Sequence, residues 1–199
     1  MPDPSTTSAP TRVVIAEDEA IIRLDLKELL EDEGYQVVGE TGRGDEAIEL
    51  VRTLGPDLVI LDIKMPGVDG LSVARHVAGE RMAAVLILTA FSQRELVEQA
   101  RDAGALAYLV KPFQQSDLIP AMEIALGRFA ELSALEREVG DLQERLEARK
   151  VVDRAKGRLM DGSAMTEQEA WRFLQQRAMA TRRKIADIAR DVVDGTLEP

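Results

Sequence analysis

The sequence Leu58-Val59-Ile60-Leu61-Asp62 is a short apolar run that ends on a carboxylate. Two further runs, at 13–16 and 85–88, are also continuously apolar and rich in β-branched residues. Such runs are typical of the central strands of a parallel sheet, because these strands are buried on both faces. Asp62 is therefore expected to lie where a buried strand ends.

Apolar runs alternate with amphipathic helical patterns throughout residues 12–127. Two less regular runs, near 35–39 and 107–110, bring the number of expected strands to five. Helical patterns lie near 20–33, 44–54, 70–80 and 93–103. Five strand-then-helix units predict an α/β domain with a five-stranded, doubly wound parallel sheet of the flavodoxin-like type and right-handed crossovers.

A long helical pattern follows this domain. It begins near Ser116, the expected N-cap, with Pro120 in its first turn, and continues to about residue 160. Apolar residues recur within it at spacings of 3, 4, 3 and 4, which is a heptad pattern. They are Leu132, Leu135, Val139, Leu142 and Leu146. We expect 128–148 to be a coiled-coil linker helix that pairs two chains, and a single amphipathic helix packed on its own domain is the alternative.

The end of the chain predicts a small all-α module at 149–194. A loop is expected at 161–164, and Thr166 with Glu169 then forms a capping box at the start of a helix. A last helix is expected at 182–194. Three short helical segments depend on packing against one another, so we expect a three-helix C-terminal domain.

Charge is distributed unevenly along the chain. Residues 1–127 hold 22 acidic and 11 basic side chains, whereas residues 149–192 hold 6 acidic and 11 basic ones. Cations that share one face attract phosphate backbones, although ordinary solvated helix surface has the same composition. Because aromatic residues are scarce, Trp171, Phe173 and Met179 are expected to fill the core of this basic segment.

Composition excludes several classes of function. The chain has no cysteine, which removes disulfides, thiolate metal sites and cysteine nucleophiles and suits a cytoplasmic protein. No apolar run approaches the roughly 20 residues of a membrane span. Residues 1–11 are polar and rich in Pro, Ser and Thr, so they are expected to form a disordered leader. Glycine patterns of nucleotide-binding loops are absent, and no membrane or small-molecule partner is expected.

Polar side chains follow four of the expected strands. They are Glu17, Asp18, Asp62, Thr89 and Lys111. Open α/β sheets place their chemistry at the carboxyl ends of strands, so these groups are expected to converge. Crowded carboxylates repel one another unless a cation is present, and oxygen ligands with room for water favour Mg²⁺. A carboxylate beside Mg²⁺ can attack a phosphoryl donor, and an ammonium and a hydroxyl can bind the transferred oxygens.

Residues 12–127 resemble the receiver domain of two-component response regulators. The motifs that carry this resemblance are Ile15-Ala16-Glu17-Asp18-Glu19, Leu61-Asp62-Ile63-Lys64-Met65-Pro66-Gly67-Val68-Asp69-Gly70, Leu88-Thr89-Ala90 and Tyr108-Leu109-Val110-Lys111-Pro112-Phe113. The resemblance implies that Asp62 is the phosphoacceptor and that the phosphohistidine of a sensor histidine kinase is the donor. It also implies that the chain is no independent enzyme, because the site acts only on its own aspartyl phosphate.

The same resemblance implies a magnesium site. Its ligands would be Asp18, Asp62 and the backbone carbonyl of Lys64, with Glu17 acting through water. Glutamate at position 17 departs from the aspartate that the family has more often, which affects the expected metal geometry rather than the activity.

The resemblance further implies a switch. Thr89 would bond the phosphoryl oxygen, and the Tyr108 ring would turn into the space that Thr89 leaves. A cis peptide is implied before Pro112. The surface of the last two strand–helix units would change, and the phosphorylated chain would form a homodimer.

Residues 140–194 resemble the ANTAR domain. The motifs are Arg154-Ala155-Lys156-Gly157-Arg158-Leu159-Met160, Glu169-Ala170-Trp171 to Leu174, Ala178-Met179 and Ile185-Ala186-Asp187-Ile188-Ala189. This resemblance implies binding to paired RNA stem-loops in nascent transcripts and antitermination of transcription. The expected RNA contacts are Lys156 and Arg158 first, followed by Arg154, Arg182, Arg183 and Lys184.

Two other output functions stay open on the sequence. Many response regulators bind DNA, and the short connection at 161–166 is compatible with a helix-turn-helix. A phosphorylation-controlled protein-interaction module is the second alternative. Binding to RNA hairpins, compared with binding to duplex DNA at fixed salt, distinguishes these classes.

Overall fold

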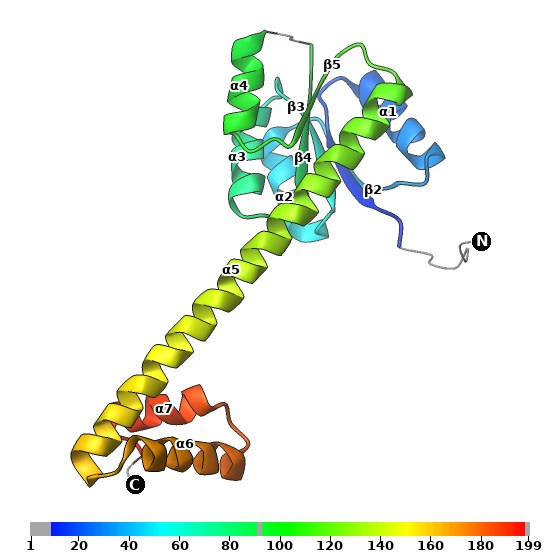
Figure 1. Cartoon of the computed structure of the whole chain (residues 1–199). Coiled ribbons are helices and arrows are strands. Elements are labelled where there is room, and N and C mark those ends of the chain that lie inside the picture. The colour runs from blue at the N-terminus through cyan, green and yellow to red at the C-terminus, as the bar shows by residue number, and fades with distance from the viewer. Residues whose placement is uncertain (1–8, 91–92, 198–199) are drawn as a thin grey trace. The chain divides into compact units, whose positions relative to one another are not determined.

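The computed structural model describes residues 9–90 and 93–197 (Figure 1). Residues 1–8 of the expected leader lie outside this part of the chain. The chain divides into two compact units, Met1–Ser133 and Ala134–Pro199. None of the helices in the described part combines the length and apolar character that crossing a membrane requires.

The first unit is built on a five-stranded parallel sheet with the strand order β2-β1-β3-β4-β5 (Figure 1). The strands are β1 (Arg12–Ala16), β2 (Gln36–Thr41), β3 (Leu58–Asp62), β4 (Ala84–Thr89) and β5 (Ala107–Val110). The predicted doubly wound sheet is therefore confirmed. In β3 and β4 every residue is buried, as continuously apolar runs require.

Helices cover both faces of this sheet. They are α1 (Ala20–Asp32), α2 (Gly44–Leu54), α3 (Gly70–Gly79), α4 (Arg94–Asp102) and the first turns of α5 (Gln115–Ser163). Successive strand residues point to opposite faces. Val59 accordingly packs in the cluster with α2 and α3, whereas Ile60 packs in the cluster with α1 and α5. The fully buried residues of both layers are aliphatic, which fits the low aromatic content.

Gly70 fixes the connection between β3 and α3. A Cβ atom at this position would lie 1.9 Å from the carbonyl oxygen of Asp62. The Gly70 amide donates a hydrogen bond to the Ile63 carbonyl at 2.9 Å. Because both neighbours are backbone, neither can move without displacing the end of β3. Glycine is needed here to hold the backbone of Asp62 in place.

Replacing Gly70 with alanine is therefore expected to destabilise the first unit by about 3 kcal/mol, the upper part of the range for overpacking. The matched control is Gly79→Ala in the same helix, where an added Cβ would meet nothing within 4 Å. Chemical denaturation of both variants measures the difference. Equal stability of the two variants would show that the contact with Asp62 does not constrain the fold.

Helix α5 begins differently from the prediction. Its first residue is Gln115, so Ser116 lies inside the helix and is not its N-cap. The Asp117 carboxylate accepts a hydrogen bond from the Gln114 amide at 3.0 Å, which stabilises the first turn in place of a serine cap. Pro120 is the sixth helical residue and not part of the first turn.

Helix α5 also ends later than predicted. It continues to Ser163, so most of the expected loop at 161–164 is helical. A single glycine such as Gly162 costs a helix only about 1 kcal/mol, and the buried Leu159 anchors the turn before it. The helix stops where Ala164 adopts a left-handed conformation with φ of 51°.

The second unit packs the end of α5 against two helices, α6 (Glu167–Thr181) and α7 (Ile185–Asp194). The predicted capping box is confirmed: the Thr166 hydroxyl accepts from the Glu169 amide, and the Glu169 carboxylate accepts from the Thr166 amide at 2.8 Å. The core is small and contains Ala155, Leu159, Ala170, Leu174, Ala178, Ile188, Ala189 and Val192. Four of these eight residues are alanine, which allows the three helices to approach closely.

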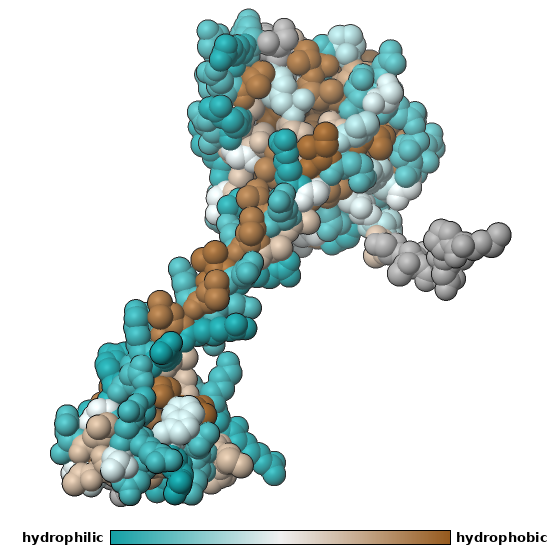
Figure 2. All heavy atoms as spheres, in the orientation of Figure 1, coloured by the Kyte–Doolittle hydropathy of each residue, from teal (hydrophilic) through white to brown (hydrophobic). Residues whose placement is uncertain are grey.

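Four of the five heptad residues of α5 form an exposed apolar stripe (Figure 2). Leu135, Val139, Leu142 and Leu146 are 53%, 52%, 55% and 53% exposed. These side chains are not packed into any core of the chain. Pairing of two chains through this stripe stays a prediction, and so does the alternative of a single amphipathic helix packed on its own domain.

Candidate functional site

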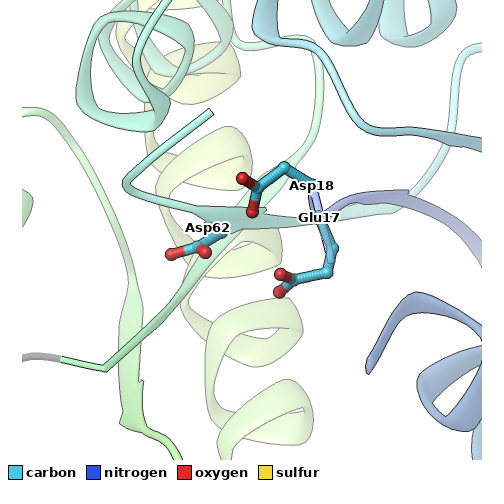
Figure 3. Close-up of side chains that lie close together, drawn as sticks. All are labelled: Glu17, Asp18 and Asp62. Carbon is cyan, nitrogen blue, oxygen red and sulfur yellow. The ribbon is translucent and has the colours of Figure 1, made fainter. Parts of the chain in front are cut away.

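Three carboxylates meet at the carboxyl ends of β1 and β3 (Figure 3). Glu17 and Asp18 follow β1, and Asp62 is the last residue of β3. Each offers an oxygen that lies within 4.8 Å of the others. Glu17 and Asp62 are buried, whereas Asp18 is exposed. The cluster is therefore open to solvent on one side only.

Parallel pairing brings these residues together. Ala16 lies opposite Leu61 in the register of β1 and β3, so the two strands end side by side. One oxygen of Asp62, Oδ1, accepts a hydrogen bond from the Ile63 amide at 2.6 Å. The other, Oδ2, is 3.0 Å from the Lys111 ammonium. Asp62 is thus held in one orientation from two sides.

Lys111 joins the carboxylates from the end of β5. Its Nζ atom lies 2.5 Å from Glu17 and 3.0 Å from Asp62, and its side chain is 10% exposed. The peptide bond between Lys111 and Pro112 is cis, as the family resemblance implies. Four of the side chains that were expected at this edge of the sheet therefore lie together: Glu17, Asp18, Asp62 and Lys111.

Burial and charge act in opposite directions on the two paired groups. Burial raises the pKa of Glu17, and the hydrogen bond from Lys111 offsets only part of that effect. Burial alone would lower the pKa of Lys111, but hydrogen bonds to Glu17 and Asp62 carry it above its ordinary value. The ionised form of Glu17 is therefore incompletely stabilised by the protein, and a further cation would stabilise it.

The residues present fit a hard divalent cation. Three carboxylates and one ammonium give a local charge of about −2 when all are ionised. All the donor atoms are oxygens, and the exposed Asp18 leaves room for water, which suits Mg²⁺. Lys64 lies two residues after Asp62 in the loop before α3. Its carbonyl stays a predicted ligand.

Removing the Lys111 charge is expected to tighten Mg²⁺ binding. The ammonium contacts Glu17 and Asp62 and so competes with a metal ion for them. A Lys111→Met variant should bind Mg²⁺ about tenfold more tightly, because a nearby like charge is lost. Calorimetric titration measures this, with Lys27→Met as the control, because Lys27 is a half-buried lysine of α1 that pairs with Glu40 and not with the cluster. Unchanged or weaker binding in Lys111→Met would contradict the competition.

Thr89 and Tyr108 form a second pair at this edge. Thr89 ends β4 and is fully buried, and Tyr108 lies in the neighbouring β5. The Thr89 side chain is close enough to the Tyr108 hydroxyl to affect its pKa through hydrogen bonding. Burial raises the pKa of Tyr108, and the bond from Thr89 opposes that shift. The two residues of the expected switch are therefore in direct contact.

The two cations expected to contact RNA first have structural partners. Lys156 is 18% exposed and forms ion pairs with Asp153 at 2.9 Å and Glu167 at 2.8 Å. Arg158 donates a hydrogen bond to the carbonyl of Val193 near the end of α7. Both side chains therefore stabilise the packing of the second unit. Their predicted RNA contacts would have to be made alongside these bonds.

The other four cations expected to contact RNA differ in whether they form ion pairs within the protein. Arg183 pairs with Asp191 at 2.7 Å, and Lys184 lies 3.4 Å from Glu144. Among the described residues, neither the Arg154 nor the Arg182 guanidinium lies in a hydrogen bond or close ion pair, although the charge of Arg154 acts on Glu147. These two cations are therefore the more available for a phosphate.

The expectation that the large side chains of this unit fill its core is only partly right. Phe173 packs against the core, and Arg177 lies over its ring at 5.5 Å. Trp171 is 38% exposed and Met179 is 80% exposed, so both were wrongly placed in the core. The signal was available: the buried residues Ala170, Leu174 and Ala178 are four apart, and this spacing leaves Trp171 and Met179 outside the buried stripe.

Comparisons with known proteins agree with both family resemblances, to the receiver domain and to the ANTAR domain. The response regulator receiver domain matches residues 13–123, and the ANTAR domain matches residues 140–193. Transcriptional regulatory protein PdtaR of Mycobacterium tuberculosis is 56% identical over 187 residues, which cover 94% of this chain and 91% of that protein. Chemotaxis protein CheY of Thermotoga maritima is 37% identical over 56% of this chain and 93% of its own length.

Solved structures confirm the receiver fold. The signal receiver domain of the response regulator NarL from Mycobacterium tuberculosis superimposes with a TM-score of 0.57 at 31% identity. The match covers 59% of this chain and 97% of that domain. Two domain families match consecutive segments of the chain, and one relative matches nearly its whole length. Together these matches decide the classification. The chain belongs to the two-component response regulators in which a receiver domain is followed by an ANTAR domain.

Proposed function

We propose that this response regulator accepts a phosphoryl group on Asp62 from a sensor histidine kinase and couples that event to RNA stem-loop binding and transcription antitermination. The observation that carries the first step is the cluster of Glu17, Asp18 and Asp62 with Lys111 at one edge of the sheet. The ANTAR match supports the second step. Because nascent bacterial transcripts are made in the cytoplasm, a protein with this function would act there.

Phosphoryl transfer requires an oriented carboxylate and compensation of charge. An oxygen of Asp62 attacks phosphorus, a P–O bond forms, and the P–N bond to the kinase histidine breaks. The imidazole leaves with the bonding electron pair. Lys111 already contacts Asp62 Oδ2 and would pair with an oxygen of the transferred group.

The proposed magnesium ligands are Asp18, Asp62 and the Lys64 carbonyl, with Glu17 acting through water. When bound there, Mg²⁺ supplies charge neutralisation to the phosphoryl oxygens. Because the acceptor is a side chain of the protein itself, the site acts only on its own aspartyl phosphate. No separate small-molecule product is proposed.

The contact between Thr89 and Tyr108 supports the proposed switch. The Thr89 hydroxyl has one proton, and turning it toward a phosphoryl oxygen would draw this side chain away from Tyr108. The phosphoryl group on Asp62 would carry about −1.5 to −2 charges, and an acceptor of that charge competes strongly for the Thr89 proton. The Tyr108 hydroxyl would lose its partner, and its ring would change position at the edge strand β5.

The exposed stripe on α5 supports dimerisation of the phosphorylated chain. Four half-exposed apolar residues at heptad spacing gain most from burial against an identical helix. A dimer would carry two ANTAR domains. Two hairpins on one transcript could then bind together, and the second would bind at a raised effective concentration.

Cations of the second unit would bind the RNA phosphates. The proposed contacts are Arg154, Lys156, Arg158, Arg182, Arg183 and Lys184. Arg154 and Arg182 are free of side-chain hydrogen bonds and ion pairs within the described chain, so we expect the largest losses of affinity from their removal. Each contact that is lost should also reduce the salt dependence of binding.

A direct comparison of ligands tests the proposed output. The full chain is titrated with a tandem stem-loop RNA and with a DNA duplex of equal charge, at several salt concentrations. We expect tighter binding to the RNA, with affinity that falls as salt rises. Preference for the duplex would favour a DNA-binding regulator. Weak binding to both without salt dependence would favour a protein-interaction module.

A further inference from the structure

Trp171 borders a pocket in the second unit. The pocket has a volume of about 480 Å³ and lies between α5 and the first turn of α6. It is lined by Lys156, Thr166, Glu167, Gln168 and Trp171. An indole that is 38% exposed beside such a pocket leaves an aromatic surface available to a flat ligand.

Positive charge in this pocket is compensated, so the space beside Trp171 suits a neutral group better than a phosphate. Lys156 is the cation of the pocket, and it is already paired with both Asp153 and Glu167. One ammonium and two carboxylates give a local charge of about −1. The Thr166 hydroxyl is 2.8 Å from the Glu169 carboxylate and so has a partner as well. What the pocket offers is acceptor oxygens, from Glu167 and the Gln168 amide, next to an aromatic face.

An exposed positive charge lies just outside the pocket. Arg172 follows Trp171 and is exposed, and its charge also acts on Glu169 in the first turn of α6. It lies one helical turn from Gln168 on α6, so the two side chains share a face of the helix. A ligand with a neutral, flat part and an anionic part would therefore meet complementary groups at Trp171 and Arg172.

We propose that this pocket binds an unpaired base of an RNA hairpin loop, stacked on Trp171. The polar edge of the base would face Gln168 and Glu167, and an adjacent phosphate would lie at Arg172. Loop bases are unstacked and can be splayed into a protein pocket. The proposal rests on the proposed RNA-binding function and assigns to one residue the contact that distinguishes a loop from a duplex.

Fluorescence gives a direct test because Trp171 is the single tryptophan of the chain. The probe is a tandem stem-loop RNA selected on the wild-type protein from a library with randomised loops. The full chain, in Mg²⁺ and beryllofluoride, is titrated with this RNA and with versions in which each loop base is removed in turn. We expect quenching of Trp171 by the intact RNA and loss of quenching when one particular base is absent.

Affinities of two variants complete the test. Trp171→Ala should weaken binding to the intact RNA about tenfold, the lower part of the range for one stacked base. It should bind the RNA that lacks the identified base no more weakly than wild type does. Trp171→Phe should retain most of the affinity, and thermal unfolding followed by circular dichroism verifies that both variants are folded.

The outcomes separate this inference from the function on which it rests. If the selection yields no hairpin that wild type binds, RNA binding itself is wrong. If wild type binds them tightly while Trp171 fluorescence is unchanged and Trp171→Ala binds equally well, RNA binding stands and the base pocket is wrong. A penalty from Trp171→Ala that is the same for every abasic RNA would also overturn the pocket.

Discussion

Asp62→Ala is expected to abolish phosphorylation of the chain, by the cognate kinase and by a small donor such as acetyl phosphate alike. The variant lacks the carboxylate oxygen that would form the new P–O bond, and no other residue of the cluster is oriented in the same way. In wild type, Asp62 is held by the Ile63 amide on one side and by Lys111 on the other. Labelling with a phosphate-affinity gel measures the loss.

The control for this prediction is Asp102→Ala. Asp102 is an exposed carboxylate at the end of α4, where it pairs with Arg101. Its removal changes the net charge by the same amount and should leave labelling at the wild-type level. Labelling that persists in Asp62→Ala would place the phosphoryl group on another residue and contradict the proposed site.

Leu142→Lys is expected to weaken the activated dimer about 100-fold. This corresponds to losing the burial of one leucine on each of two helices, at about 1.5 kcal/mol apiece. Leu142 is 55% exposed in the single chain, so the substitution removes little of the chain's own packing. Sedimentation equilibrium in Mg²⁺ and beryllofluoride measures the dissociation constant.

Asp141→Asn is the matched control for the coiled coil. It changes the charge of α5 by the same single unit at the neighbouring position, which lies off the heptad stripe. The dimer should keep its wild-type dissociation constant in this variant. A dimer that tolerates Leu142→Lys as well as Asp141→Asn would mean that the stripe is not the dimer surface.

The receiver fold and the acidic cluster could be predicted from sequence because they depend on local patterns. A buried parallel strand needs a continuous apolar run, and its carboxyl end then fixes where the next polar residue lies. This rule placed Glu17 and Asp62 at neighbouring strand ends, and the structure brings their oxygens within 4.8 Å of each other. Because clustered carboxylates repel one another, the same pattern also predicted a bound cation.

Side-chain partners of the second unit could not be predicted in the same way. Lys156 and Arg158 read as free cations in a basic segment, yet the structure pairs one with Asp153 and Glu167 and the other with the Val193 carbonyl. These partners are as many as 35 residues away in sequence and depend on how three helices pack. A charge count along the chain contains no such information.

Trp171 shows a different limit of sequence reasoning. The scarcity of aromatic residues favoured a core position for it, because something large seemed necessary to fill a small domain. The core is instead closed by alanines at 155, 170, 178 and 189, which let the helices approach and leave no room for an indole. Composition therefore indicated that a large side chain must fill the core, whereas closely packed helices need none.

Binding of a tandem stem-loop RNA, measured with and without beryllofluoride in Mg²⁺, tests the coupling between the acidic site and the output domain most directly. We expect tight, salt-dependent binding by wild type only when the phosphoryl mimic is present, and no response to the mimic in Asp62→Ala. Wild-type affinity that is the same with and without the mimic would contradict the coupling.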